Sequence, residues 1–176
     1  MAQSLKKILV VKELDKITIT DITNDCGINR QTFYYHFKDI YDLLEWIFAN
    51  EVVEKIEKET TIETWQDNFK YVLDYMLKNK KFIIKTYNSL SRKTLLDFLF
   101  NQYNTIFIEI VNDLSKNYNI TKENKIFIAN FYKYGFAGII ENWIVTEMKE
   151  SPESIIKKLD VMISGNFEEA VRKMSN

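Results

Sequence analysis

Two helix-start signals separated by a glycine constrain the fold of this chain more than any other feature. Thr18 and Asp21 form a capping box, in which the threonine oxygen accepts from a backbone N–H and the carboxylate reaches back to the cap. Gly27 follows where the chain needs a left-handed backbone, which costs glycine little. Asn29 is a second N-cap, for a helix over 30–38. The run therefore predicts a helix-turn-helix.

The second predicted helix has an apolar side and a polar side. At about 100° per residue, Phe33 and Phe37 fall on one side, which we expect to face a core. No acidic residue occurs from Ile28 to Lys38. The polar side chains can therefore donate to phosphates and to base edges in a DNA major groove. They are Arg30, Gln31, Thr32, Tyr34, Tyr35, His36 and Lys38.

This region resembles the DNA-binding domain of the TetR (tetracycline-repressor-like) family of transcription regulators. The resemblance rests on Arg30-Gln-Thr-Phe-Tyr-Tyr-His-Phe-Lys-Asp-Ile-Tyr-Asp-Leu43, preceded by Thr18-Ile-Thr-Asp-Ile22 and Gly27-Ile28. Its wording is closest to the branch that contains the dihydroxyacetone-kinase operon activator. The rest of the chain is similar in its helical pattern and in Tyr134-Gly-Phe-Ala-Gly-Ile-Ile-Glu-Asn-Trp143, followed by Ser151-Pro-Glu.

The resemblance implies that the outward side chains of the second helix lie at the groove and the DNA backbone. It carries this role to Gln31, Thr32, Tyr34, Tyr35 and His36. The chemistry of the residues themselves favours Arg30 or Gln31 for base reading, by bidentate hydrogen bonds to guanine or adenine respectively.

Residues on either side of this helix are further candidates. Thr18 and Thr20 are candidates for phosphate contacts, although Thr18 acts chiefly as a cap. The family usually has a phosphate-contacting lysine where this chain has Ile40. Lys38, or the backbone amides at the start of the next helix behind its cap Asp39, would then replace that contact.

The charge of the chain argues against a general basic surface. The net charge is −1, whereas nucleic-acid-binding domains are usually basic. Acidic residues also flank the acid-free helix on both sides. Lys6, Lys7 and Lys16 are candidates for additional phosphate contacts. A helical interaction module that does not bind DNA therefore stays open as an alternative.

The scarcity of turn-forming residues predicts the fold class. Four glycines and one proline in 176 residues disfavour a β-sandwich and favour long helices. We expect an all-α protein with an N-terminal three-helix helix-turn-helix head, residues 1–46. A helix from 41 to about 59, apolar as far as Val53 and Ile56, would join this head to a larger helical body, residues 47–176, for ligand binding and dimerisation.

Apolar periodicity predicts the other helices. The first follows a Ser4 cap and covers Leu5 to Leu14. Thr121 and Ser151 are N-caps in the body, the latter with Pro152 at the first helical position. The predicted body helices cover 64–79, 82–90, 94–116, 126–148 and 151–174.

The body is rich in aromatic residues. The resemblance places an effector cavity among its helices, where tyrosine hydroxyls would orient a ligand. The candidate pocket residues are Tyr71, Tyr75, Phe82, Tyr87, Tyr103, Phe107, Tyr132 and Phe136. An ordinary filled core explains the same residues.

Two glycines inside a predicted long helix indicate close approach of another helix. Gly135 and Gly138 each cost roughly 1 kcal/mol against alanine. The resemblance implies a dimer in which the last two helices of each subunit form a four-helix bundle. The candidate interface residues are Gly135, Gly138, Ile139, Trp143, Ile155, Leu159 and Met162. The alternative is that the glycines pack within one chain.

The reactive side chains are too few for common catalytic sites. His36 is the only histidine and Cys26 the only cysteine, so a disulfide, a thiolate or histidine metal site and a His-activated nucleophile cannot be assembled. We expect no enzyme, no metal and no cofactor. Cys26 is expected in the core, and His36 is either a phosphate contact or an ordinary structural residue. No segment reads as a signal peptide or membrane span, so we expect a cytoplasmic protein.

These features predict a homodimeric repressor of TetR type. It would bind a palindromic operator in double-stranded DNA and be released by an effector in the C-terminal domain. One alternative is a transcriptional activator controlled by a partner protein. The predicted partners are operator DNA, a second copy of the chain, and a small-molecule effector or a protein co-regulator.

Overall fold

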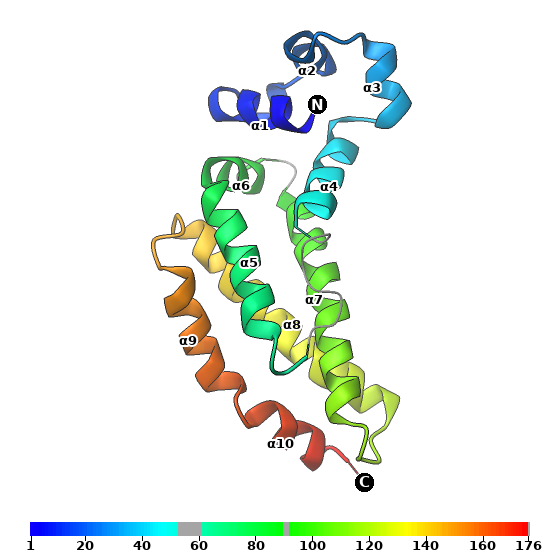
Figure 1. Ribbon diagram of the computed structural model, residues 1–176, viewed down its shortest axis with the longest axis vertical. Helices are drawn as coiled ribbons and strands as arrows, with labels where there is room; N and C mark the ends of the chain where they lie inside the picture. The colour runs from blue at the N-terminus through cyan, green and yellow to red at the C-terminus, as the bar shows by residue number, and fades with distance from the viewer. Residues whose placement is uncertain (53–60, 90–91, 176) are drawn as a thin grey trace. The chain divides into compact units, whose positions relative to one another are not determined.

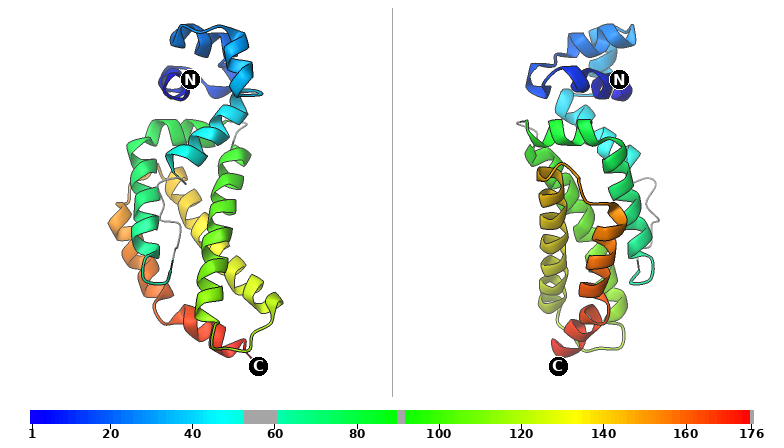
Figure 2. Two further views of the ribbon diagram at one scale, coloured as in Figure 1. Left: turned by 45° about the vertical axis from the view of Figure 1, so that its right-hand side comes forward. Right: turned by 90° about the vertical axis from the view of Figure 1, so that its left-hand side faces the viewer.

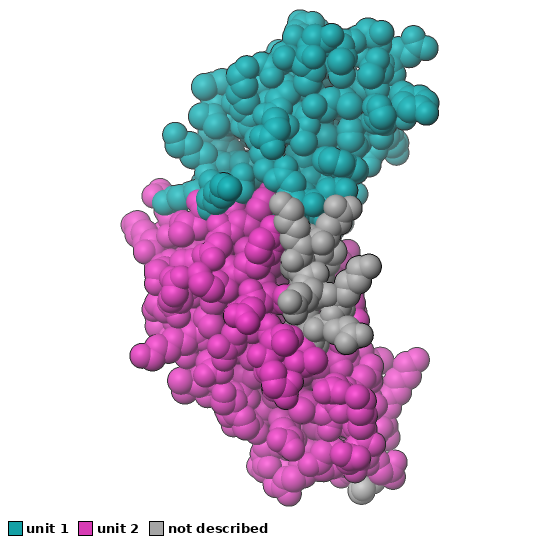
Figure 3. Space-filling view, viewed as in Figure 1, with its two compact units in different colours: residues 1–55, 78–98 teal, residues 56–77, 99–176 magenta. Residues whose placement is uncertain are grey.

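The computed structural model describes residues 1–52, 61–89 and 92–175. These residues form helices, joined by turns and loops, and no strand. The all-α prediction is therefore confirmed. The chain divides into two compact units (Figure 3), of which unit 1 is Met1–Lys55 with Lys78–Phe98 and unit 2 is Ile56–Leu77 with Leu99–Asn176.

Unit 1 contains the helix-turn-helix pair. Its elements are α1 (Ala2–Val11), the short 3-10 helix η1 (Leu14–Lys16), α2 (Ile19–Cys26), α3 (Arg30–His36), α4 (Ile40–Glu51), α6 (Lys80–Tyr87) and the start of α7 (Arg92–Leu114). The side chains with no exposed surface in its core include Leu5, Leu9, Ile22, Phe33, Leu43, Leu44 and Ile47. These apolar residues hold α1 to α4 together as the predicted head.

The sixth helix also belongs to unit 1, although it follows α5 in the chain. α6 packs beside α1 (Figure 1), and its Phe82 ring lies 5.7 Å from the ring of Phe48 on α4. Lys85 on α6 pairs with Glu13, 2.6 Å between Nζ and Oε1. The unit around the helix-turn-helix pair thus extends through α4 and α6, and a domain boundary after residue 46 stays a prediction.

The start of α1 differs from the prediction. The helix begins at Ala2, so Ser4 lies inside it and is buried. The Ser4 hydroxyl donates to the backbone oxygen of Ile22, 3.4 Å away on α2. The predicted Ser4 cap is therefore wrong, because this hydroxyl faces a neighbouring helix instead of the helix end. α1 also ends at Val11, and Leu14 falls in η1.

The predicted shared helix is described only in part. α4 runs from Ile40 to Glu51 and is followed by the buried Val52. The predicted continuation over Val53 and Ile56 lies outside the described residues, as does Leu90 at the predicted end of α6.

Unit 2 contains α5 (Trp65–Lys78) up to Leu77, α7 from Leu99, α8 (Lys122–Val145), α9 (Pro152–Ile163) and α10 (Asn166–Lys173). The predicted caps are confirmed. Thr121 accepts from the N–H of Asn124 at 3.2 Å, and Ser151 accepts from the N–H of Ser154 at 3.3 Å. Pro152 occupies the start of α9, where its missing N–H costs nothing.

The predicted last helix is two helices. α9 ends at Ile163 and α10 begins at Asn166 (Figure 2). Gly165 between them has φ of 76°, a left-handed conformation that favours glycine. The turn lets the buried Phe167 stack on Tyr132 of α8, with 3.9 Å between ring centroids. Burial of this ring accounts for the break, which the apolar periodicity alone does not indicate.

Candidate functional site

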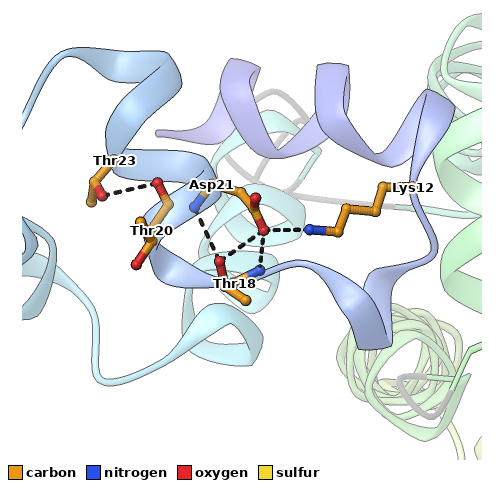
Figure 4. Close-up of polar contacts among 5 residues, drawn as sticks. All are labelled: Lys12, Thr18, Thr20, Asp21 and Thr23. Atoms are coloured by element: carbon orange, nitrogen blue, oxygen red, sulfur yellow. Dashed lines mark hydrogen bonds and ion pairs between the residues drawn. The ribbon is translucent and has the colours of Figure 1, made fainter.

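The first helix of the motif is held at its start by a closed set of hydrogen bonds. The Thr18 hydroxyl oxygen accepts from the N–H of Asp21 at 3.1 Å (Figure 4). Asp21 Oδ2 in turn accepts from the Thr18 N–H at 2.7 Å and the Thr18 hydroxyl at 2.8 Å. The predicted capping box is therefore present. Because the Thr18 hydroxyl is engaged on both sides, its main role is the cap.

Asp21 also connects the motif to the end of α1. Lys12 Nζ lies 2.6 Å from Asp21 Oδ2. The hydrogen bond from Lys12, followed by those from Thr18, lowers the pKa of Asp21 from 3.8 to about 2. Thr20 is exposed on the same helix, and its backbone oxygen accepts from the Thr23 hydroxyl at 3.3 Å (Figure 4).

The turn between the two helices follows the predicted pattern. Gly27 adopts φ of 66° and ψ of 31°, in the left-handed region. Asn29 then caps α3, because its Oδ1 accepts from the N–H of Thr32 at 2.8 Å and from the Thr32 hydroxyl at 3.0 Å. The Thr32 hydroxyl keeps its oxygen available as an acceptor.

α3 is divided into a buried and an exposed side, as its periodicity predicts. Phe33 and Phe37 are buried, with 5.8 Å between their ring centroids. Thr32 is half-buried at the edge of the exposed side. The exposed residues are Arg30, Gln31, Tyr34, Tyr35 and His36, followed by Lys38 just beyond the helix. The face that these seven outward residues form, from Arg30 to Lys38, is called the reading face below.

Two contacts order side chains on the reading face. Arg30 Nη2 lies 3.3 Å from the Tyr34 hydroxyl, and its guanidinium carbon is 5.9 Å from the Tyr34 ring centroid. Tyr35 and His36 pack edge to face at 5.0 Å between centroids. Arg30 and Tyr34 therefore form a pair in which the tyrosine restrains the arginine.

Two carboxylates hold the loop after α3 by accepting hydrogen bonds from backbone N–H groups. Asp39 caps α4 by accepting from the Asp42 N–H at 2.9 Å, and Asp42 accepts from the Lys38 N–H at 2.8 Å. The Lys38 side chain remains exposed, whereas Ile40 is half-buried. Tyr41 is a further exposed aromatic in the first turn of α4. The periodicity of α3 does not identify Tyr41, because it lies on the next helix. Its position two residues after the Asp39 cap is the sequence signal that places it near the reading face.

The other candidate lysines of the head differ in orientation. Lys16 is exposed. Lys7 is exposed but forms an ion pair with Asp25 on α2. Lys6 is nearly buried and pairs with Glu51, so a phosphate contact from Lys6 does not fit this arrangement. Lys6 and Lys7 point in directions about 100° apart on the helix. The sequence does not show which of these directions faces a neighbouring helix.

The core of unit 2 holds a small cavity. Its volume is about 20 Å³, enough for about one water molecule. Aromatic and apolar side chains line it together with the buried Asn68. The Tyr103 hydroxyl, also on the lining, is buried without a hydrogen-bond partner among the described residues. Burial raises the pKa of Tyr103 well above its usual range.

The predicted pocket residues do not all lie together. Tyr103, Phe107 and Phe136 line the cavity, with Trp65, Asn68, Phe69, Val72 and Ile106. Tyr132 packs on Phe107 at 6.1 Å between centroids, while Tyr71 and Tyr75 are half-buried on α5. Phe82 and Tyr87 are buried in unit 1. Three of the eight predicted pocket residues therefore line the cavity.

α8 is apolar on both sides. Its inward side supplies buried residues such as Ile128, Phe136 and Ile140 to the core of unit 2. Its outward side, called the α8 stripe below, is exposed and carries no charge. The α8 stripe consists of Phe127, Phe131, Tyr134, Gly135, Gly138, Ile139, Asn142 and Val145. An exposed apolar surface of this kind typically marks an interaction site.

The predicted interface residues divide between this exposed surface and the core. Gly135, Gly138 and Ile139 lie on the α8 stripe, and Met162 is exposed on α9. A Cβ built on either glycine meets no atom within 4 Å among the described residues outside its own helix. Among the described residues, no other helix of the same chain therefore packs closely against these two glycines. The remaining three, Trp143, Ile155 and Leu159, are buried within the subunit.

Comparison with known proteins identifies the family. Residues 63–165, more than half of the chain, match the model of a TetR-type transcriptional regulator C-terminal region. The chain belongs to the TetR family. The match covers most of unit 2 and is independent of the helix-turn-helix residues, so both parts of the chain point to the same family.

Individual TetR-family relatives are similar over most of the chain. One is the HTH-type dhaKLM operon transcriptional activator DhaS of Lactococcus lactis subsp. lactis (strain IL1403), 26% identical over 147 residues, which are 82% of this chain and 78% of the relative. A solved structure, dihydroxyacetone kinase operon activator DhaS, superposes with a TM-score of 0.73 at 23% identity. It covers 99% of this chain and 96% of its own. The fold is therefore shared from end to end.

Membership of the TetR family makes this protein a DNA-binding transcriptional regulator. Proteins of this family are regulators and not enzymes, and they bind DNA as dimers. No helix of the described residues has both the length and the apolar character to cross a membrane. The reading face of α3 has a chemistry suited to DNA, since it exposes hydrogen-bond donors and no carboxylate.

Proposed function

We propose that the protein binds a palindromic operator as a homodimer, with one reading face in the major groove of each half-site. The observation that carries this proposal is the exposed, acid-free reading face, anchored from behind by Phe33 and Phe37. Arg30 and Gln31 would contact base edges, and Tyr34, Tyr35, His36 and Lys38 the groove and phosphates. Thr20 would add a phosphate contact at the start of α2, whereas the Thr18 hydroxyl stays engaged in the cap. Half-sites would lie one or more helical turns apart.

The α8 stripe supports the dimer. It presents Phe127, Phe131 and Tyr134 beside two glycines, so a second copy of α8 could approach its backbone closely. Met162 and Val161 on α9 are exposed as well. Among the predicted interface residues, we propose that Gly135, Gly138, Ile139 and Met162 contact the partner. Trp143, Ile155 and Leu159 would support them from within the subunit.

Selection of bound sequences from random duplex DNA tests this function. The expected result is a palindrome with half-sites one or more turns apart. A Gln31→Glu variant serves as control, because it places a carboxylate on the reading face without changing the core, and its selection should return no motif. Absence of enrichment by the native protein at low salt would reject the proposal.

Two forms of control are compatible with such a regulator. In the first, the protein is a repressor released by a small molecule bound among Tyr103, Phe107 and Phe136. In the second, it is an activator controlled by a partner protein, acting like the relative named as an operon activator. The small size of the cavity lined by these residues favours the second, because its volume of about 20 Å³ is far smaller than the several hundred cubic ångströms of usual ligand sites.

A reporter gene under the selected operator distinguishes the two forms of control in the cytoplasm where we expect the protein to act. Deletion of the regulator gene should abolish expression if it is an activator. Expression that rises on deletion would instead support the repressor.

A further inference from the structure

One lysine of α1 is turned into unit 1 and joins three helices. Lys6 Nζ forms an ion pair with Glu51, the last residue of α4, and donates to Asn79 Oδ1 at 3.1 Å, just before α6. It also lies 5.4 Å from the centroid of the Phe82 ring on α6. The Lys6 side chain is only 12% exposed. A nearly buried ammonium group is costly unless it is paired, so these partners hold it in one place.

The two polar partners of Lys6 are close in sequence to positions where the chain changes from one unit to the other. The chain leaves unit 1 after Lys55, returns at Lys78 and leaves again after Phe98. Glu51 ends α4 in the first of these segments, and Asn79 lies next to the point of return.

The third connection is tied to the same helices by aromatic packing. Phe98 stacks on Phe48 of α4 at 5.1 Å between centroids, and Phe48 contacts Phe82 at 5.7 Å. This group of unit 1 side chains, called the junction cluster, therefore includes a residue close in sequence to each position where the chain changes unit. Its members are Lys6, Phe48, Glu51, Asn79, Phe82 and Phe98.

The neighbouring lysine of α1 points to the motif instead. Lys7 forms an ion pair with Asp25 on α2, and Ser4 donates to the backbone of Ile22 on the same helix. α1 thus contacts α2 through one side and the junction cluster through another. A continuous path of contacts therefore runs from the ends of α4 and α6 through Lys6 to α1, and from α1 to α2 of the helix pair that carries the reading face.

We propose that Lys6 is a positioning residue for DNA binding, which couples the state of unit 2 to the reading face through its contacts with Glu51 and Asn79. This inference rests on the proposed function, because it concerns how control of that DNA binding reaches the head. It predicts that DNA binding and unit 2 influence each other, since coupling between sites is reciprocal.

Hydrogen–deuterium exchange of the full-length protein tests this coupling. The probe is the operator duplex obtained from the selection, so failure of the proposed function would be known beforehand. The response is measured at backbone amides of residues 65–77 and 99–114, the parts of α5 and α7 in unit 2, at protein concentrations where the dimer is saturated. In the native protein, operator binding should change their exchange by about fivefold or more, the lower end of usual coupling.

Three substitutions give the comparison. Lys6→Met keeps an aliphatic chain over Phe82 but removes the charge, and it should abolish the response of unit 2 while DNA is still bound at saturation. Lys6→Arg retains the cation and should retain the response. Lys81→Met is the matched control, because it removes the same charge from an exposed lysine of α6, and it should respond like the native protein.

Two results would overturn the proposal. One is a unit 2 response of Lys6→Met equal to that of Lys81→Met. The other is a native protein whose unit 2 does not respond to operator at all. If the role of Lys6 were purely structural, Lys6→Met would accelerate exchange in α1 and α4, but unit 2 would still respond to operator binding. If Lys6→Met does not fold, Asn79→Ala, which removes one of its acceptors, should weaken the response and is judged by the same criteria.

Discussion

Tyr35 is 83% exposed, whereas Phe33, two residues earlier on the same helix, has no exposed surface. Two residues on a helix are separated by about 200°, so one ring anchors α3 in the core while the other projects outward. The two aromatic side chains therefore have different roles. Phe33 stabilises the head, and Tyr35 is accessible to a ligand.

Substitutions at these two residues should separate DNA binding from folding. We expect Tyr35→Ala, and likewise Arg30→Ala, to weaken operator binding by about tenfold or more, equivalent to about 1–3 kcal/mol. Their free energy of unfolding should stay within about 0.5 kcal/mol of the native value. Phe33→Ala should instead cost about 3–5 kcal/mol of stability. Fluorescence anisotropy with an operator duplex and urea unfolding measure both quantities. Unchanged DNA binding by Tyr35→Ala and Arg30→Ala would refute the residue assignment.

The capping carboxylate of α2 should make the head sensitive to acid. The pKa of Asp21 is about 2 in the folded chain against an ordinary 3.8, so the unfolded chain takes up the proton first as the pH falls. The stabilisation is therefore complete above about pH 4 and is lost between about pH 4 and pH 2. Asp21→Asn should lower the thermal unfolding midpoint at pH 7, and its difference from the native protein should shrink toward pH 2.

Lys12→Met is the companion variant for this pH dependence. It keeps the capping box of Thr18 and Asp21 but removes the contact that lowers the pKa of Asp21 most. Its midpoint should also approach that of the native protein as the pH falls toward 2. Differences that stay constant from pH 7 to pH 2 would show that Asp21 is not the titrating group.

The α8 stripe should be required for dimerisation. Phe131 is 69% exposed in the subunit, so Phe131→Glu should leave the fold intact and raise the dimer dissociation constant by at least about 30-fold, or about 2 kcal/mol. Gly138→Leu should act in the same direction, because a Cβ at this position meets no atom within 4 Å in the subunit, whereas the leucine side chain would keep a second helix from approaching closely. Analytical ultracentrifugation measures the dissociation constant. Val11→Glu, at a residue 84% exposed in unit 1, is the control and should remain dimeric. A dimer of native strength in both α8 variants would exclude this interface.

The buried hydroxyl of Tyr103 should lower stability. It has no hydrogen-bond partner among the described residues, and such a group costs about 1–3 kcal/mol of desolvation. Tyr103→Phe should therefore raise the free energy of unfolding by about 1 kcal/mol, measured by urea unfolding. Tyr35→Phe, which removes a hydroxyl at the surface, should change it by less than about 0.5 kcal/mol. A loss of stability in Tyr103→Phe would indicate that the hydroxyl has a bound partner, such as a water or an effector.

The sequence predicts the local features of this protein well because their causes lie within a few residues. The capping boxes and caps at Thr18, Asn29 and Ser151 depend on hydrogen bonds to residues three positions away. The two sides of α3 follow from helical periodicity alone. The residues of the reading face therefore follow from the order of amino acids in this short segment.

Other features depend on which helices meet, and only the tertiary structure decided them. Ser4 and Lys6 face inward because α1 packs against α2, α4 and α6, whose residues are distant in the sequence. The break at Gly165 allows Phe167 to pack on Tyr132. Long-range packing likewise selects which aromatic residues line the small cavity of unit 2 and which belong to unit 1. The sequence by itself therefore determined α3 and its exposed side, through local hydrogen bonding and periodicity. The arrangement that would connect this helix to unit 2 was decided by contacts between helices far apart in the chain.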